Sequence, residues 1–406
     1  MKQEHTEKAG RANGLVTDSD MSYPNLLMGD GARLEETKKR VEKGDPAVIN
    51  AFKEIVDLAE AALCSPIGSV TEKLDLPPSG DRQDYLSLAP YWWPNPDTID
   101  GFPYVWRDGV ENPRRNESDI GRMETMIYSV CSLSVAYYFT GNETYAKNAA
   151  ERLRVWFLDQ RTRMYPNLKY AQTRLGHGKT NFGGIIEATR WRWMLDAAIL
   201  LELSDAWSQK DAEGLRQWFG EFGDWLVESP EGIEESWSAN NHGSWYSMQL
   251  LLCSMYSGNL DRANKLLEEM PRRISTQYFM DGRQPYEIIR SAGLHYSNYN
   301  NLAFVDIGRM ALKLGFDLFS FECSDGRGLR LGMEYCASFL TCEKQWPAQQ
   351  VRPIAMWRVA ETYWRASKGF NEASFVDLVR KLPEKNLPLA ITRLLDPLPS
   401  EWEPLY

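Results

Sequence analysis

The sequence has no long apolar run: none approaches the roughly 20 residues that a membrane-spanning helix needs. Its first eleven residues are polar and lack the apolar core of a secretory signal. We therefore expect a soluble protein that makes no membrane contact. It would be periplasmic or secreted if a signal peptide has been removed, and cytoplasmic otherwise.

Histidine is scarce, with only four in 406 residues. There is no HExxH motif, and no spacing between the histidines places two on one helical face, so no metal site is predicted. The GxSxG turn of serine hydrolases and the phosphate-binding GxxxxGK(S/T) loop are absent too. The six cysteines occur singly without a CxxC pair, which predicts buried free thiols. We expect no cofactor.

Basic residues are outnumbered, with 46 Lys and Arg against 56 Asp and Glu and a net charge of −10. Nonspecific binding to nucleic acid or to an anionic membrane is therefore disfavoured. A polyanionic substrate would need a local basic cleft.

What the chain has in excess is aromatic side chains, with 15 Trp, 19 Tyr and 15 Phe. Most of the Phe residues can simply fill a large core. Tryptophan and tyrosine next to polar residues are different, because flat rings that stack on sugar faces hold carbohydrates in water. The excess of Trp and Tyr therefore favours a saccharide ligand.

Helical periodicity dominates most of the chain. Apolar spacing, N-caps and Gly stops predict helices over 46–63, 120–139, 145–158, 184–203, 212–227, 240–257, 260–274, 302–314, 328–340, 353–366 and 372–382. Alternating strands are scarce. Short turns between the helices imply antiparallel hairpins, so we expect an all-α (α/α) toroid, an incomplete barrel of such hairpins. We predict a loose N-terminal arm over 1–30 and one catalytic domain over 31–406.

Two long irregular stretches interrupt the helices. Residues 65–118 are rich in Pro, Gly and rings, and such a stretch in a compact protein is usually functional or disordered. We interpret it as the lining of a substrate cleft, although the same rings could pin it over the core: Tyr85, Tyr91, Trp92 and Trp93. Residues 164–184 are Gly-rich and would form a second wall, with positive charge from Arg174, His177 and Lys179.

One short stretch sets an unusual group of polar side chains ahead of an apolar run. Residues 236–246 read SWSANNHGSWY, which places Asn240, Asn241 and His242 side by side, followed by Trp245 and Tyr246. A histidine between amides and large rings, in a chain with so few histidines, indicates chemistry. We predict that these residues bind or act on the substrate.

A second stretch, residues 285–302, adds an arginine, another histidine and two phenols: Arg290, His295, Tyr296 and Tyr299. The tyrosines share a face if this region is helical. We hypothesise that both stretches meet in one cleft. Simpler explanations exist for each residue, since His295 and one tyrosine could serve packing alone and Arg290 could pair with Glu287.

These residue types suit β-elimination on a uronic acid. The substrate carboxylate must be neutralised by donors, a base must take the C5 proton, and an acid must protonate the leaving oxygen. Asn241, His242 and Arg290 suit the first task, and a tyrosine or histidine suits the others. A glycoside hydrolase would instead need two carboxylates across the scissile bond. Three glutamates just upstream keep that alternative open: Glu231, Glu234 and Glu235.

Four segments carry a family resemblance: residues 85–96 (YLSLAPYWWPNP), 165–172 (YPNLKYAQ), 240–242 (NNH) and 294–299 (LHYSNY). Through them the chain resembles, from about Tyr85 to Trp364, the alginate lyase family with an (α/α) toroid fold. It is most similar to polysaccharide lyase family 38 and more distantly similar to family 5.

The resemblance implies roles for particular residues. In family 5 an Asn-His pair and an Arg neutralise the uronate carboxylate, and a Tyr acts as base and acid. By motif the pair falls on Asn241 and His242 and the phenol on Tyr299, with Tyr296 as a rival. His242 would be the base if guluronate is also accepted. The family's Arg would fall on Ala292, so Arg290 is a substitute nearby.

The implied activity is cleavage of a 1,4-linked polyuronate, alginate first and glucuronan second, to give 4,5-unsaturated uronate ends without a cofactor. The partner is thus an acidic polysaccharide. A hydrolase with paired carboxylates and a noncatalytic carbohydrate-binding protein are the alternatives.

Overall fold

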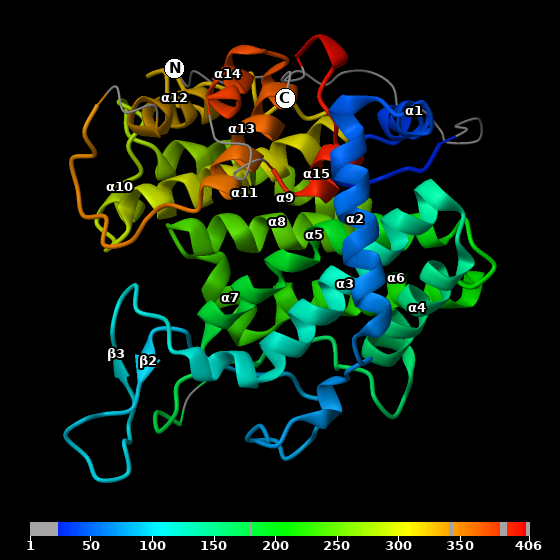
Figure 1. Cartoon of the computed structure of the whole chain (residues 1–406). Helices are drawn as coiled ribbons and strands as arrows, with labels where there is room; N and C mark the ends of the chain where they lie inside the picture. The colour runs from blue at the N-terminus through cyan, green and yellow to red at the C-terminus, as the bar shows by residue number, and fades with distance from the viewer. Residues whose placement is uncertain (1–22, 179, 341–343, 382–387, 403–406) are drawn as a thin grey trace.

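The computed structural model describes residues 23–178, 180–340, 344–381 and 388–402, which are predominantly helical (Figure 1). The helices are α1 (Gly31–Glu42), α2 (Pro46–Cys64), α3 (Asp119–Thr140), α4 (Glu143–Leu153), α5 (Trp191–Leu201), α6 (Gln209–Glu228), α7 (Pro230–Ser236), α8 (Asn241–Tyr256), α9 (Leu260–Gln277), α10 (Pro285–Ile288), α11 (Gly293–Lys313), α12 (Leu329–Leu340), α13 (Met356–Phe370), α14 (Ser374–Arg380) and α15 (Ala390–Leu395). None of these described helices combines the length and the apolarity that crossing a bilayer requires.

Short segments complete the described structure. The strands are β1 (Leu86–Leu88), β2 (Trp92–Trp93), β3 (Val105–Trp106) and β4 (Tyr170–Thr173). The 3₁₀ segments are η1 (Val70–Glu72), η2 (Pro113–Glu117), η4 (Phe182–Arg190) and η6 (Ser400–Trp402), and η3 (Arg154–Leu158) is a π segment.

The helices fall into two classes by the way in which they are buried. Helix α8 is buried on every side, including polar residues such as Ser247 and Gln249. Helix α9 buries a single stripe, made of Ala263, Leu267, Met270, Ile274 and Gln277. A helix buried all round must lie inside the fold, whereas one with a single apolar stripe covers the core from outside.

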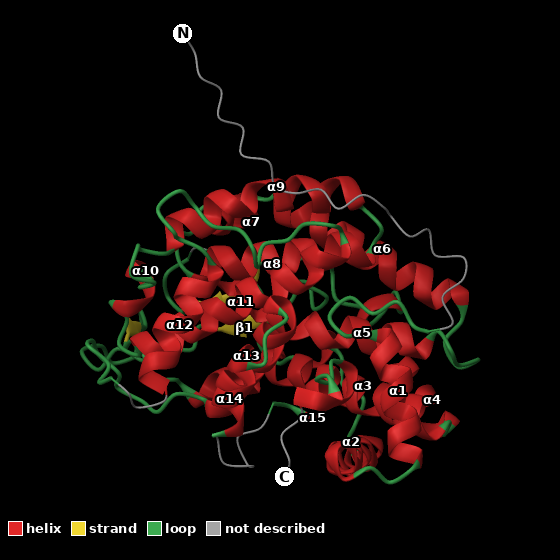
Figure 2. Cartoon of the chain, turned by 90° about the horizontal axis from the view of Figure 1, so that it is seen from above, coloured by secondary structure: helices red, strands yellow, loops and turns green. Residues whose placement is uncertain are grey.

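The two classes form two layers around one core. Helices α3, α5, α8, α11 and α13 make the inner layer, each in contact with the next. Helices α2 and α4 pack outside α3, α6 and α9 outside α8, α12 outside α11, and α14 outside α13. The view from above shows the outer helices surrounding the inner ones (Figure 2). Contacts of α15 with α2 and α3 complete the circuit, which confirms the predicted (α/α) toroid.

The predicted helices are present, but some limits differ. The helix predicted over 145–158 ends at Leu153 and continues as the π segment η3, and the one over 184–203 starts with the 3₁₀ segment η4. The helix predicted from Leu302 begins at Gly293, so it carries the second polar stretch. The pattern does not predict α1, α7, α10 and α15, and the last three have only 7, 4 and 6 residues.

A buried carboxylate holds the first described segment against the core. Asp196 on α5 accepts hydrogen bonds from the backbone N–H groups of residues 27–29 at 2.5 to 3.2 Å. The next N–H, of Asp30, donates to the carbonyl of Leu395 at the end of α15 at 2.8 Å. The prediction of a loose arm over 1–30 is therefore wrong for these residues, and its first 22 residues lie outside the described part.

Buried ion pairs connect three of the inner helices. Arg192 on α5 pairs with Asp306 on α11 at 2.6 Å and with Glu361 on α13 at 2.7 Å. Arg365 on α13 pairs with Asp306 at 2.7 Å and with Asp396, just after α15, at 2.8 Å. Because each charge has an opposite partner, none is left uncompensated in the low-dielectric interior.

The cysteine prediction holds for three thiols. Cys131, Cys253 and Cys336 are free and buried, as expected. Cys323 is half-buried, and Cys64 at the last position of α2 is exposed, which the prediction of buried thiols did not anticipate. Cys342 lies outside the described residues.

The long stretches before α3 and η4 carry the small sheets. Strands β2 and β3 form an antiparallel ribbon with Trp92 opposite Trp106, and β1 pairs in parallel with β4. Figure 1 shows the β2–β3 ribbon standing away from the helical body. These connections bring two stretches that are far apart in sequence, 85–93 and 170–177, to one end of the toroid.

Candidate active site

The Asn-Asn-His stretch forms the start of α8. The side chain of Asn240 caps the helix by accepting a hydrogen bond from the His242 N–H at 3.1 Å, the usual role of Asn at this position. Asn241 and His242 are therefore the first two helical residues. The partial positive charge of the helix start lies at these side chains, which favours an anion in front of them.

A buried carboxylate orients His242. Nδ1 of the imidazole lies 2.8 Å from Oε1 of Glu235, the penultimate residue of α7. Burial disfavours the charged imidazolium, but the Glu235 carboxylate outweighs it and raises the pKa of His242 above its usual value. The protonated ring can then donate from Nε2 to a substrate anion.

A second buried carboxylate holds Asn241. Glu287 on α10 accepts hydrogen bonds from the backbone N–H of Asn241 and from its Nδ2, the latter at 2.8 Å. Burial raises the pKa of Glu287 to about 7, although the two donors from Asn241 work in the opposite direction. Among the described residues Oδ1 of Asn241 has no partner. That oxygen can only accept a hydrogen bond, so an anion would have to be bound through the second hydrogen of Nδ2, and the Asn241 residue is only 1% exposed.

The second polar stretch begins α11, and its side chains meet α8. Tyr299 lies four residues after His295 and three after Tyr296, so it neighbours both on the helix surface. The ring of Tyr299 packs on that of Trp245, with centroids 4.7 Å apart. Because Trp245 lies one turn after His242 on α8, the two predicted stretches pack against each other. That they line one substrate cleft stays a prediction.

Positive charge surrounds Tyr299. The guanidinium carbon of Arg358 on α13 lies 4.8 Å from its ring centroid. Arg190 at the end of η4 and Arg192 on α5 also interact electrostatically with this phenol. These guanidinium groups place positive charge next to the phenol. Tyr299 is half-buried, which leaves it open to a ligand.

Tyr296 has a different environment. Its hydroxyl lies 2.9 Å from that of Tyr91, a residue of the loop before β2. Burial, together with the Tyr91 phenol, raises the pKa of Tyr296, although Arg290 opposes the shift. Tyr296 therefore keeps its proton and suits a hydrogen-bond donor better than a base.

Arg290 is already engaged. It pairs with Asp108 at 3.0 Å, and its guanidinium carbon lies 4.0 Å from the Tyr296 ring centroid. The alternative of an ion pair between Arg290 and Glu287 is not what the structure shows. Arg290 links α10 to the segment after β3, and its charge is partly compensated by Asp108.

His295 is buried among cations. Burial, followed by Arg358, Arg352 and Arg290, lowers the pKa of His295 to about 3. The ring is therefore neutral at any working pH, and Nε2 lies 3.5 Å from Nη1 of Arg358. A neutral imidazole can accept a hydrogen bond from this guanidinium, which positions it.

The two irregular stretches contact each other. The Trp92 ring contacts His177 edge-on at 4.7 Å, and the Arg174 guanidinium lies 5.0 Å from the Trp92 centroid. Arg174 also donates to Asn181 at 2.9 Å. Gly183 packs so closely that an added Cβ would lie 3.2 Å from Cε1 of His242, so this stretch reaches the imidazole. The predicted residue Lys179 lies outside the described residues.

Three residues predicted to bind substrate are core residues instead. Tyr85 is fully buried and donates to Glu187 at 2.7 Å, and Tyr246 donates to the Leu226 carbonyl at 2.9 Å. Trp245 is 1% exposed beneath Tyr299. For these three the prediction of substrate contact is wrong. Trp93 is intermediate between a core residue and an exposed one. It is half-buried, and its indole N–H donates to the Val110 carbonyl.

Sequence reasoning missed Glu287 and Arg358 and gave Glu235 another role. Glu235 was a candidate for a hydrolase pair, but it is fully buried against His242, whereas Glu234 is exposed. Glu287 was considered only as a partner of Arg290. Arg358 lies in an amphipathic helix that shows no motif. No signal in the sequence places any of these beside the Asn-His pair.

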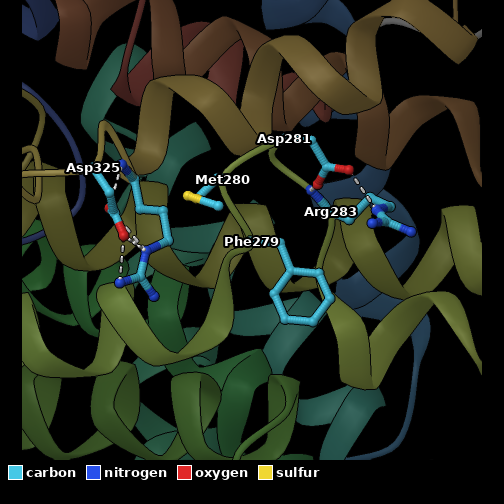
Figure 3. Close-up of a pocket in the computed structure, with 6 residues that line it drawn as sticks. Phe279, Met280, Asp281, Arg283 and Asp325 are labelled. Atoms are coloured by element: carbon cyan, nitrogen blue, oxygen red, sulfur yellow. Dashed lines mark hydrogen bonds and ion pairs between the residues drawn. The ribbon is translucent and has the colours of Figure 1, made fainter.

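A separate hollow of about 440 Å³ lies between the loop after α9 and the loop before α12. Its lining is Phe279, Met280, Asp281, Arg283, Asp325 and Arg327 (Figure 3). The two arginines each pair with a neighbouring aspartate, Arg283 at 2.6 Å. None of the predicted site residues belongs to this hollow.

Comparisons with known proteins give a consistent result. The sequence model of the family described as alginate lyase matches residues 69–346. An alginate lyase structure from Bacteroides ovatus is 32% identical, with a TM-score of 0.87 over 92% of this chain and 99% of that one. No curated protein sequence gives a significant match.

More distant structures share the fold. Alginate lyase A1-III from Sphingomonas species A1 is 16% identical, with a TM-score of 0.59 over 93% of this chain and 98% of that one. An A1-III variant complexed with a tetrasaccharide is 14% identical, with a TM-score of 0.56 over 95% and 99% of the two chains.

Proposed function

Because this chain belongs to the alginate lyase family, we propose that it cleaves alginate, an acidic 1,4-linked polyuronate, by β-elimination. The observation that carries the mechanism is the position of Tyr299. A half-buried phenol lies among guanidinium groups and directly above the helix that presents Asn241 and His242. This is the combination of base, acid and charge neutralisation that elimination beside a carboxylate requires.

Asn241 and His242 bind the carboxylate of the sugar that loses its proton. His242 donates from Nε2 while Glu235 holds its other nitrogen, and the Asn241 amide is held by Glu287. Neutralising the carboxylate stabilises the negative charge that develops at C5. The start of α8 adds its partial positive charge at the same place.

Tyr299 acts as base and then as acid. The phenolate takes the C5 proton, the electron pair forms the C4–C5 double bond, and the bond from C4 to the glycosidic oxygen breaks. The same hydroxyl returns a proton to the leaving oxygen, so the products are a new chain end and a 4,5-unsaturated uronate. Arg190, Arg192 and Arg358 interact electrostatically with this phenol.

Incubation with alginate, polyglucuronate and a neutral glucan tests this function. We expect ultraviolet absorbance from the new double bond with alginate first and with polyglucuronate second. New reducing ends without absorbance would mean hydrolysis, and binding without cleavage would mean a carbohydrate-binding protein; either would refute the proposal. The burial of Glu235 against His242 already counts against a hydrolytic pair at this position.

A further inference from the structure

The arginines at the site differ in whether an acid neutralises them. Arg290 pairs with Asp108 and Arg352 pairs with Glu111, at 3.0 and 3.2 Å. Arg190 pairs with Glu124 at 2.5 Å. Arg192, just beyond, pairs with two carboxylates of the inner helices.

Arg358 has no such partner. Among the described residues no carboxylate lies within ion-pair distance of its guanidinium. Its neighbours are the neutral ring of His295 at 3.5 Å, the Tyr299 ring at 4.8 Å and the Trp357 ring at 5.0 Å. Arg190 and Arg192 add further positive charge nearby.

A half-buried cation without a counter-ion is costly, because desolvation is not repaid by an opposite charge. An anionic ligand would supply the missing counter-charge, so such a group is typical of an anion-binding site. Glu361 lies one turn further along α13, but its carboxylate binds Arg192 instead. The local sequence therefore contains an acid at helical spacing that does not neutralise Arg358.

We propose that Arg358, and not Arg290, is the arginine that binds the uronate carboxylate during elimination, with His295 as the positioning residue that holds it. This rests on the proposed function. Arg358 lies against the face of the phenol that takes the C5 proton, and the carboxylate is bonded to C5. A guanidinium there can reach both groups with planar, paired donors.

Two substitutions in the full-length protein compare the rival arginines. Arg358→Ala should lower kcat/KM on alginate by about 10²–10³-fold, the usual loss when one donor to a developing anion is removed. Arg290→Ala should lower it by less, because that charge is already shared with Asp108. A loss confined to Arg290→Ala would overturn the inference.

Chemical rescue separates charge from packing. Millimolar guanidinium chloride should restore part of the Arg358→Ala activity, whereas equal sodium chloride should not. Arg358→Lys should retain more activity than Arg358→Gln, since Lys keeps the charge without the paired donors. Equal activity in these two variants, together with no rescue, would show that only packing was lost.

A matched control removes an arginine from a tyrosine ring elsewhere. The Arg216 guanidinium carbon lies 5.7 Å from the ring of Tyr256, at the far end of α8 from His242. Arg216→Ala should leave activity unchanged. Wild-type protein without absorbance on alginate would refute the proposed function itself, whereas active wild type with an active Arg358→Ala variant would refute only this inference.

Discussion

Two arginines on α13, two turns apart, have opposite surroundings. Arg365 is fully inaccessible and bonded to two carboxylates, Asp306 and Asp396. Arg358 faces rings and a neutral histidine, and no acid in the described structure pairs with it. The same residue type thus joins helices of the toroid at one position and lies against the candidate catalytic phenol at the other.

The comparison separates charges that stabilise from charges that bind. In the buried ion pairs that join α5, α11 and α13 each charge has an opposite partner, because an unmatched charge there would cost several kcal/mol. At the site the acids, Glu235 and Glu287, are used to hold His242 and Asn241, and a cation is left for the substrate. Charge balance, more than charge number, distinguishes the two regions of this acidic protein.

The largest effect on activity should follow from removing the Tyr299 hydroxyl. Tyr299→Phe should lower kcat by about 10²–10⁴-fold, the range for loss of general acid–base catalysis, measured by ultraviolet absorbance on alginate. Helical circular dichroism should not change. Tyr335→Phe, on the outer helix α12, is the control and should remain active. Near-normal turnover in Tyr299→Phe with loss in Tyr296→Phe would move the role to Tyr296.

Arg365, which is paired with two carboxylates, should contribute to the free energy of unfolding. Arg365→Met leaves Asp306 and Asp396 short of a partner and should cost about 3–5 kcal/mol of stability, seen as a clear fall in the thermal midpoint. Arg358→Met should leave the midpoint at or above the wild-type value, because the cation it removes has no counter-ion. Equal midpoints in the two variants would abolish the distinction between structural and binding charge.

The pH dependence of kcat/KM should show the effect of Glu235 on His242. The charged groups that act on His242 are Glu235, Glu287 and Arg290. Glu235 raises the pKa of His242, so the protonated form persists to higher pH and activity falls as pH rises through that pKa. Glu235→Gln should move this alkaline limb to lower pH and reduce kcat/KM by about 10–100-fold. Glu234→Gln is the exposed neighbouring control, and an unmoved limb in Glu235→Gln would argue against a charged His242.

The smallest effect on activity should come from Trp92, in the irregular stretch before α3. Trp92 lies between His177 and Arg174 and would stack on a sugar ring, so Trp92→Ala should raise KM roughly two- to tenfold with little change in kcat. Phe279→Ala, in the separate hollow of Figure 3, should not change KM. A fall in the thermal midpoint without a change in KM would make Trp92 a packing residue.

The local patterns could predict most helices and the meeting of the two polar stretches. Helical spacing and caps are properties of neighbouring residues, so α2, α3 and α8 follow from the sequence directly. The toroid follows from many helices and short turns, and the resemblance reinforced it. Short helices such as α7 and α10 have too few residues to show a period.

The rest depends on contacts that sequence spacing does not encode. Glu287 reaches Asn241 from another helix, and Arg358 approaches Tyr299 from α13. The direction of an aromatic side chain is equally hidden, so Tyr85 and Trp245 looked like cleft residues although they fill the core. A ring that stacks on sugar and one that packs in a core are the same residue type.

The contacts between residues 27–30 and the end of α15 have a consequence for biosynthesis. During translation the early segment can bind Asp196 once α5 has formed, but its second partner, the Leu395 carbonyl, is made only when α15 is translated. The circuit of helices therefore closes only after α15 has left the ribosome. A nascent chain halted before α15 would expose the apolar flank of α2, an opportunity for chaperones and for aggregation.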